Sequence, residues 1–317
     1  MKKHKGKILV LFLAVLLVSV MSCENPFLKK MLVEEGKGKT VPEKPQAPFV
    51  EGGASLILSP NKLDIKVKVT TADNSYVRIE GCTETELTSG TETVLHAKGR
   101  RVILKGKIIE LSCDWNRLTA LNVQGLTALQ ELNCSGNRLT ALNVQGLTAL
   151  KELYCYGNQL TELNMQGLTA LQMLDCDGNQ LTELNVQGLT ALRYLLCYNN
   201  RLTALNVQGC TALEGLICYN NQLTELNVQG LTALRELDCW SNRLNADAFK
   251  KLFDDLPVRQ DSDNANCILY TERIGATEGN HTDFTAPPDL KDAFDNAKIV
   301  KKWKMYKWNG SWSKVEI

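Results

Sequence analysis

The most reactive side chains of this chain are its cysteines. Seven of them recur at intervals of 21 residues. They are Cys113, Cys134, Cys155, Cys176, Cys197, Cys218 and Cys239. Thiolates bind metals and form disulfides, but this ladder has no CxxC pair and no nearby histidine, and an odd number cannot pair completely. Each cysteine instead occupies an apolar slot, where it packs as a small hydrophobic side chain. We therefore predict buried, reduced thiols, and neither a metal nor another cofactor.

Outside the ladder, the other reactive residue types are few. Cys82 and Cys267 belong to no repeat, and both a free and a paired state fit their positions. The only histidines are His4, His96 and His281, and none lies near a nucleophile pattern. No GxSxG, HExxH or complete phosphate-loop motif is present. We therefore predict a protein that is not an enzyme.

A further thiol, Cys23, lies near the amino terminus in a distinctive setting. A basic segment, MKKHKGK, precedes an apolar run over residues 8–21, which is typical of a signal peptide. The run ends in Val20-Met21-Ser22-Cys23, which resembles a bacterial lipobox in the relaxed form of spirochaete-type lipoproteins. The resemblance implies a signal peptide at residues 1–22 and a lipidated Cys23 that anchors the protein in the bacterial envelope, at the outer-membrane surface or the periplasmic face. Ordinary secretion with an unmodified Cys23 is the alternative.

Residues 23–53 have the composition of a solvated tether, since they are charged and contain Pro42, Pro45 and Pro48. Removal of residues 1–22 would take away four lysines and no acidic residue, which leaves 32 basic and 35 acidic residues and a net charge of −3. A slightly acidic body argues against general binding of nucleic acid.

The cysteine spacing belongs to a larger unit that repeats over residues 108–244, as six complete units and a half unit. The unit at residues 129–149 is LQELNCSGNRLTALNVQGLTA and contains the pattern L-x-x-L-x-C-x-x-N-x-L. A fixed period of this size indicates a solenoid, in which each unit buries its apolar edge against its neighbours. The pattern resembles the leucine-rich repeat family, and in particular its 21-residue bacterial subclass called IRREKO.

Alternation within the unit predicts the orientation of each strand. Leu132 and Cys134 should point inward, because they alternate with Glu131, Asn133 and Ser135. Equivalent strands would pair in parallel about 4.8 Å apart. The second half of the unit would form another extended segment on the opposite side. The expected fold is a β-rich solenoid with a parallel β-sheet and little helix in the repeats.

Two further positions recur along the repeats. The asparagine of the pattern, such as Asn137, should turn inward and bond backbone groups of its own and neighbouring coils. A row of identical asparagines would give a ligand site no selectivity, so we assign it a structural role. Gly125 and its equivalents should supply a positive φ where the chain turns back.

Both ends of the solenoid need caps, because open ends expose apolar surface and unpaired strand edges. Residues 54–107 alternate apolar and polar side chains and predict a small β-rich N-terminal cap whose last strand leads into the first unit. Residues 245–317 predict an α+β C-terminal cap. Its expected elements are a helix after Asn245, a strand at residues 267–271, a helix over residues 288–298 and a hairpin at Asn309-Gly310.

The outward strand positions differ from unit to unit, so we look for function there. We predict a partner-binding site on one face of the sheet that comprises Tyr154, Tyr156, Asp175, Asp177, Tyr194, Tyr198, Tyr219, Asp238 and Trp240. Exposed tyrosine and tryptophan are enriched at binding hot spots, and the carboxylates favour a basic partner. The predicted function is a cell-envelope module for protein binding or adhesion. The resemblance to leucine-rich repeat proteins of bacterial surfaces implies the same, with a host extracellular protein as one kind of partner.

Two alternatives stay open. A structural envelope spacer would need no specific ligand. The C-terminal segment, in which basic and aromatic residues interleave, is compatible with binding of glycans or anionic surfaces. Its residues are Lys301, Lys302, Trp303, Lys304, Tyr306, Lys307, Trp308 and Trp312. The plainer interpretation of this segment is a capping hairpin with buried aromatic rings and solvated lysines.

Overall fold

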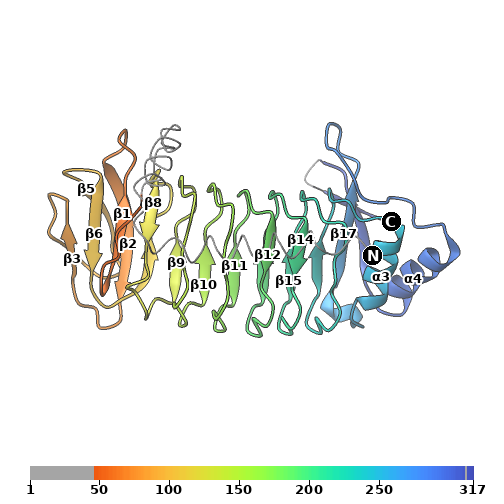
Figure 1. Cartoon of the computed structure of the whole chain (residues 1–317). Coiled ribbons are helices and arrows are strands. Elements are labelled where there is room, and N and C mark those ends of the chain that lie inside the picture. The colour runs from red at the N-terminus through yellow and green to blue at the C-terminus, as the bar shows by residue number, and fades with distance from the viewer. Residues whose placement is uncertain (1–45, 311–312) are drawn as a thin grey trace, which may run out of the picture. The chain divides into compact units, whose positions relative to one another are not determined.

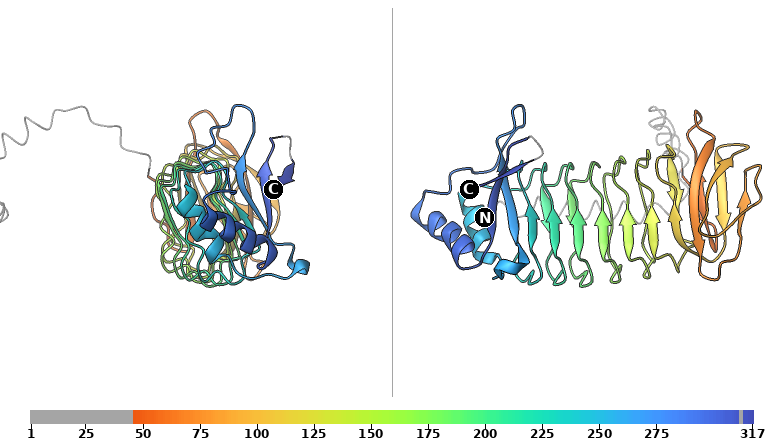
Figure 2. Two further views of the ribbon diagram at one scale, coloured as in Figure 1. Left: turned by 90° about the vertical axis from the view of Figure 1, so that its right-hand side faces the viewer. Right: turned by 180° about the vertical axis from the view of Figure 1, so that it is seen from behind.

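The computed structural model describes residues 46–310 and 313–317, which belong to one compact unit. The predicted signal peptide, Cys23, residues 24–45 of the predicted tether and Trp312 lie outside the described residues. Within the unit, strands stack side by side from an N-terminal cap to a C-terminal cap that carries α3 (Ala246–Asp255) and α4 (Pro288–Ile299) (Figure 1). Seen end-on, the successive coils lie behind one another (Figure 2).

A twelve-stranded sheet runs along one side of the solenoid. Its repeat strands are β7 (Ile108–Ser112), β9 (Glu131–Asn133), β10 (Glu152–Tyr154), β11 (Met173–Asp175), β13 (Tyr194–Leu196), β15 (Gly215–Ile217) and β16 (Glu236–Asp238). Neighbouring repeat strands are parallel and in register, so that Leu132 pairs with Leu153 and Leu174 pairs with Leu195. Equivalent positions of all units therefore form columns along the sheet. The predicted β-rich solenoid with a parallel sheet is confirmed.

The inward side of the strands is occupied by leucine and cysteine. All seven ladder cysteines are fully buried, and the ten cysteines of the described residues are free thiols, including Cys82 and Cys267. Burial raises the pKa of the Cys176 thiol and of its ladder neighbours, which keeps them protonated and poorly nucleophilic. The prediction of a buried thiol ladder is confirmed.

The asparagine column joins each coil to the one before it. The side-chain Nδ2 of Asn179 donates to the carbonyls of Cys155 and Cys176 at 3.0 and 3.1 Å. Its Oδ1 accepts a hydrogen bond from the N–H of Leu160 at 3.0 Å. The same bonds recur in the neighbouring units. The structural role predicted for these asparagines is confirmed.

The second half of each unit forms the opposite side of the solenoid, as expected, but only part of it is paired as strand. β12 (Glu183–Asn185) pairs in parallel with β14 (Ala204–Asn206). In the first unit, β8 (Ala120–Asn122) instead pairs with the N-terminal cap. The equivalent segments of the other units continue this side without ladder pairing.

The turn glycines confirm one prediction and correct another. Gly146 and its equivalents up to Gly230 have φ values between +76° and +85°. Gly125 is different, since its φ is not positive and a Cβ there would lie 1.8 Å from the carbonyl oxygen of Val50. The prediction of a positive φ at Gly125 was therefore wrong. Close approach of the N-terminal cap requires glycine at this position.

The N-terminal cap closes its end of the solenoid with strands of two sheets. β1 (Gly53–Ile57), β3 (Val77–Glu80), β4 (Glu86–Leu87) and β6 (Arg101–Lys105) form a five-stranded sheet with β8. β2 (Asp64–Thr71) and β5 (Glu92–His96) instead extend the long sheet, and β2 pairs antiparallel with β7. β6 directly precedes the first unit in the chain, as predicted, yet the strand beside β7 is β2. Backbone groups of Lys66 in β2 bond the amide of Asn116 and so end the asparagine column.

The C-terminal cap continues the sheet beyond the repeats. α3 is followed by a short helix, η1 (Asp261–Asp263). β17 (Asn266–Thr271) then pairs in parallel with β16, and β18 (Lys304–Trp308) pairs in parallel with β17. β19 (Lys314–Glu316) ends the sheet antiparallel to β18, which confirms the predicted hairpin.

Side chains tie this cap to the last unit. Asn245 Oδ1 accepts from the N–H of Ala248 at 2.9 Å and caps α3 as predicted. Asn280 extends the asparagine column, since its Nδ2 donates to the carbonyl of Cys239 at 2.9 Å. Trp303 is buried in the core, with its indole N–H donating to the carbonyl of Pro257.

Candidate functional site

The outward positions of the repeat strands form three neighbouring columns, which together we call the sheet face. The first column contains Tyr194, the second contains Tyr154, Asp175 and Asp238, and the third contains Tyr156, Asp177, Tyr198, Tyr219 and Trp240. All nine predicted residues point outward, and all are half-buried because neighbouring side chains cover one another. The structure brings eight of them together in the second and third columns and leaves Tyr194 at the margin.

Four aromatic side chains of the third column and the C-terminal cap form a stack, which we call the aromatic row. The ring centroids of Tyr198 and Tyr219 lie 4.5 Å apart, and those of Tyr219 and Trp240 lie 4.2 Å apart. Trp240 in turn stacks on Trp308 at 6.2 Å, with the ring planes 6° apart. Such stacking fixes the rings and turns their edges outward.

Trp308 is a residue of this face that the sequence analysis assigned only to the C-terminal hairpin. It joins the face because β17 and β18 extend the sheet by two parallel strands beyond the last unit. The apolar and aromatic pattern of residues 304–308 was the available signal for a strand. Nothing in the sequence indicated that this strand would pair in parallel beyond the repeats.

Two carboxylates, Asp175 and Asp177, lie next to each other at the N-terminal side of the aromatic row. Burial, followed by the hydrogen bond and negative charge of Asp177, raises the pKa of Asp175 to about 7. Burial also raises the pKa of Asp177. Two neighbouring carboxyls in a partly desolvated site resist double ionisation, so the pair retains a proton near neutral pH.

Asp238 lies at the other end of the row and is partly enclosed. It stands between Ile217 and Ile268 in its column. Its Oδ1 is buried and has no hydrogen-bond partner. Burial, with a smaller contribution from the charge of Glu236, raises the pKa of Asp238 to about 7. β17 covers the outer edge of the last unit, which accounts for the burial of this outward-pointing carboxyl.

Between these carboxyls the second column is apolar. Leu196 and Ile217 occupy the two intervening units and are half-buried beside Tyr198 and Tyr219. The face therefore has an apolar centre with a carboxyl group at each end.

Tyr194 is held apart from the aromatic row by an ion-pair network. Its ring lies over Gly215, where a Cβ would be 2.8 Å from Cδ1 of the tyrosine. Its hydroxyl accepts from Arg235 at 3.0 Å and donates to Glu214 at 3.1 Å. Glu214 is also paired with Arg193. These contacts immobilise Tyr194 and occupy its polar group.

Comparison with known proteins agrees with the architecture. The family described as "Leucine Rich repeats (2 copies)" matches residues 127–169. The solenoid is a leucine-rich repeat fold. No curated protein matches the chain.

Two solved structures are similar to parts of the chain. The functional domain of InlJ from Listeria monocytogenes, which includes a cysteine ladder, is 24% identical over 54% of this chain and 51% of that chain, with a TM-score of 0.29. Internalin C2 from Listeria monocytogenes is 25% identical over 44% of this chain and 74% of that chain, with a TM-score of 0.34. The chain thus spans about half the length of the InlJ domain that it matches.

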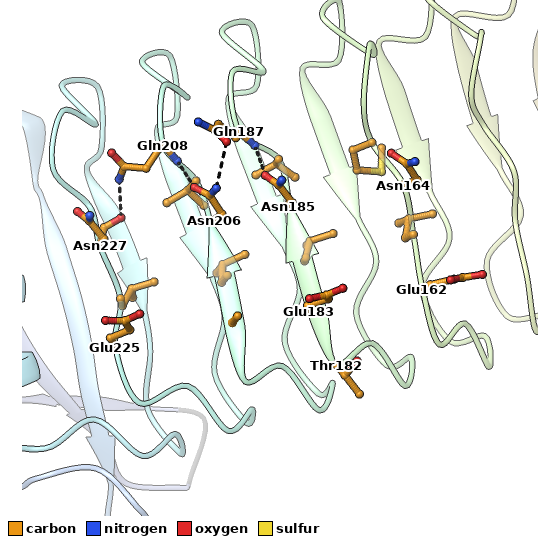
Figure 3. A pocket seen from close by; sticks show the side chains of 18 of the residues that line it. Glu162, Asn164, Thr182, Glu183, Asn185, Gln187, Asn206, Gln208, Glu225 and Asn227 are labelled. Atoms are coloured by element: carbon orange, nitrogen blue, oxygen red, sulfur yellow. Dashed lines mark hydrogen bonds between the residues drawn. The ribbon is translucent and has the colours of Figure 1, made fainter. Parts of the chain in front are cut away.

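A groove of about 1090 Å³ lies on the opposite side of the leucine-rich repeats, where the second halves of the units line it (Figure 3). Several of its asparagine and glutamine side chains are engaged within the repeats. Asn206 Nδ2 donates to Gln187 Oε1 at 3.3 Å, and Gln208 Nε2 donates to the carbonyl of Asn227 at 3.3 Å (Figure 3). Because its lining repeats from unit to unit, the groove offers less selectivity than the sheet face.

The lysines of the C-terminal hairpin are only partly available for ligands. Lys301 Nζ donates to the carbonyls of Phe253 and Asp254 at the end of α3, and burial lowers its pKa. Lys307 is paired with Glu272 at 2.7 Å. Lys302 and Lys304 are exposed. The cations of this segment therefore serve the cap in part, whereas the plainer interpretation expected all of its lysines to be solvated.

No group of three or more histidine, cysteine or acidic side chains in the described part of the chain is arranged to hold a metal ion. None of the helices in that part combines the length and apolar character that a membrane crossing requires.

Proposed function

We propose that this protein binds a basic segment of a partner protein through the sheet face of its leucine-rich repeats. The observation that supports the proposal is the order of groups along the second and third columns. The Asp175–Asp177 pair lies at one end, Leu196 and Ile217 form the apolar centre, and Asp238 lies at the other end. The aromatic row runs beside this centre and would add contact area, as aromatic side chains do at binding hot spots.

The spacing of the carboxyls favours an extended segment that crosses the strands. Asp175 and Asp238 are three strand spacings apart, or roughly 14 Å. An extended chain advances by about 3.3 Å per residue. Basic side chains four residues apart would therefore reach both carboxyl positions, with an apolar side chain between them over the centre. A host extracellular protein that exposes such a segment is one kind of partner.

Peptide spacing and pH together test this proposal. Four nonapeptides would carry two lysines at separations of two, three, four and five residues, with leucine between them, and their affinities would be measured by calorimetry. We expect the four-residue separation to bind most tightly. Binding should be about tenfold tighter at pH 8 than at pH 6, because carboxyls with a pKa of about 7 must ionise to attract lysine. Equal affinities for all four peptides, or tighter binding at pH 6, would contradict the proposal.

Variants distinguish the sheet face from overall charge. Asp175→Asn with Asp238→Asn should abolish the pH dependence and weaken binding at pH 8. The matched control is Glu183→Gln with Glu225→Gln, which removes the same charge from the groove side. If the control loses as much affinity as the test pair, only net charge is recognised. Absence of binding by every peptide would favour the alternative of a structural envelope spacer.

A location in the bacterial envelope is part of the proposal and rests on the lipobox-like residues that end in Cys23. A lipid anchor would hold the repeats at a membrane surface while residues 24–45 bridge the distance to the membrane. Metabolic labelling with a fatty-acid analogue should label the parent protein and a Cys82→Ala control, but not Cys23→Ala. Equal labelling of Cys23→Ala would exclude this thiol as the anchor.

A further inference from the structure

We propose that the corner of the first unit holds a binding site for an anionic saccharide, formed by Trp115, Lys62, Arg117 and Arg138. These side chains line one hollow, together with Asn61 and Gly136, where the N-terminal cap meets the first two units. The site adjoins the sheet face at Tyr156, but it contains none of the carboxyls of the proposed peptide site and does not depend on that proposal.

The backbone at Trp115 keeps the left-handed turn of the later units, whereas the left-handed φ of Arg117 has no counterpart in them. Trp115 and Arg117 have left-handed φ values of +55° and +56°. The next three units carry Gly136, Gly157 and Gly178 at the position of Trp115, all with positive φ. A bulky side chain in this conformation is rare, and such strain persists mainly at sites where function retains it. The first unit therefore keeps a tryptophan where the turn itself favours glycine.

The indole ring of Trp115 is supported on one side and open on the other. A Cβ on Gly136 would lie 2.4 Å from the Cδ2 of Trp115, so the ring rests directly on the backbone of the next unit. Tyr156 meets the ring edge-on, with the centroids 6.4 Å apart. Trp115 is nevertheless 62% exposed. This geometry presents a fixed aromatic platform, and the negative face of such a ring attracts the polarised C–H bonds of a sugar.

Three cations surround the platform without an acidic partner. Lys62 Nζ donates to the carbonyl of Trp115 at 2.9 Å, which holds the ammonium group at the hollow. Arg117 and Arg138 occupy equivalent positions of adjacent units and are exposed. None of the three takes part in the ion pairs found within the described residues. Uncompensated cations favour an anion, and the guanidinium fork suits a carboxylate or a sulfate.

The surroundings favour a single anionic sugar over a nucleic-acid strand. Asp114 precedes the tryptophan, and Glu110, Glu131 and Glu152 lie in register in the first column of the sheet face. A continuous phosphate backbone that left the hollow along β7 would pass Asp114 and then reach Glu110. A single anionic sugar would place its charged group beside the three cations and its C–H bonds against the indole ring.

Calorimetry with defined oligosaccharides tests the site in the mature protein. The probes are a hyaluronan tetrasaccharide, which is carboxylated, a chondroitin sulfate tetrasaccharide, which is also sulfated, chitotetraose, which is neutral, and an octathymidylate. We expect both anionic saccharides to bind and to weaken with added salt, with chitotetraose at least about tenfold weaker. A preference between the two anionic probes identifies carboxylate or sulfate as the group recognised. Equal binding of chitotetraose, tighter binding of the oligonucleotide, or no binding of any saccharide would overturn the proposal.

Two variants separate binding from folding. Trp115→Gly restores the residue of the following units, so we expect binding to be lost while the unfolding midpoint does not fall. Arg117→Gln with Arg138→Gln changes only exposed side chains and should weaken binding at least about tenfold. The matched control is Arg201→Gln, which lies in the same column of a later unit where Asn199 replaces the tryptophan. Unchanged binding by either test variant, or an equal loss in the control, would reject this site.

Discussion

Successive residues of the repeat strands point alternately inward and outward, and the inward and outward polar groups differ in their hydrogen bonding. Inside, the amide of Asn179 has backbone partners for both its nitrogen and its oxygen. Outside, Asp238 has a buried oxygen with no partner, and Asp175 and Asp177 crowd each other. The inner side satisfies the polar groups of this column within the fold, whereas the outer side leaves some of its carboxyls without full satisfaction. Under the proposed function, stability and recognition would lie on opposite sides of the same strands.

The largest effect should follow from a change on the inner side. Asn179→Ala would remove bonds to Cys155, Cys176 and Leu160 and leave buried backbone groups unpaired. We expect the free energy of unfolding to fall by about 3 kcal/mol, measured by urea denaturation. The control is Asn185→Ala in β12, whose exposed side chain accepts one local bond from Gln187. A similar loss in both variants would remove the distinction between the two sides.

A smaller loss of stability is expected when one buried thiol on the inner side is changed. Cys176→Ser places a hydroxyl in a fully buried apolar slot, and we expect a loss of about 2 kcal/mol. Cys176→Ala removes the sulfur without adding a polar group and should cost about 1 kcal/mol. If serine is tolerated better than alanine, the slot is not apolar.

On the outer side, Asp238→Asn should stabilise the protein at alkaline pH. Burial raises the pKa of Asp238 from 3.8 to about 7, so the folded state binds this proton more tightly than the unfolded state. The associated stability is present below pH 4 and is lost as pH rises through about 7. At pH 8 the variant should therefore be more stable by about 1–2 kcal/mol, with little difference at pH 4. Thermal unfolding across this range measures the effect, and a variant that is less stable at pH 8 would contradict the assignment.

The smallest change in stability is expected in the aromatic row. Tyr219→Ala breaks the stacks with Tyr198 and Trp240, but the ring is half-buried. We expect a loss of about 1 kcal/mol together with strongly reduced peptide affinity. A loss as large as that of Asn179→Ala would indicate that the row belongs to the core.

The repeats could be predicted in detail because every unit has the same neighbours. Once Cys134 and Asn137 are assigned to the inner side of one unit, the period assigns all their equivalents, and the structure agrees. Alternation alone also placed the nine residues of the sheet face outward.

Prediction failed where the repeats meet the caps, because those contacts follow no period. The carbonyl of Val50 requires glycine at position 125, and β17 encloses Asp238. Trp308 enters the aromatic row through a strand distant in sequence. At Trp115 a signal was present, since tryptophan replaces the glycine of the following units.

Because each coil contacts only its neighbours, the number of coils between Asp175 and Asp238 could change without altering the contacts within the other coils. Deleting one 21-residue block within this interval would keep every inward contact type and shorten the gap between the carboxyls by about 4.8 Å. The preferred lysine separation would then contract by one or two residues. Gain or loss of whole blocks would thus adjust the length of the ligand that is recognised, in fixed increments and with an unchanged interior.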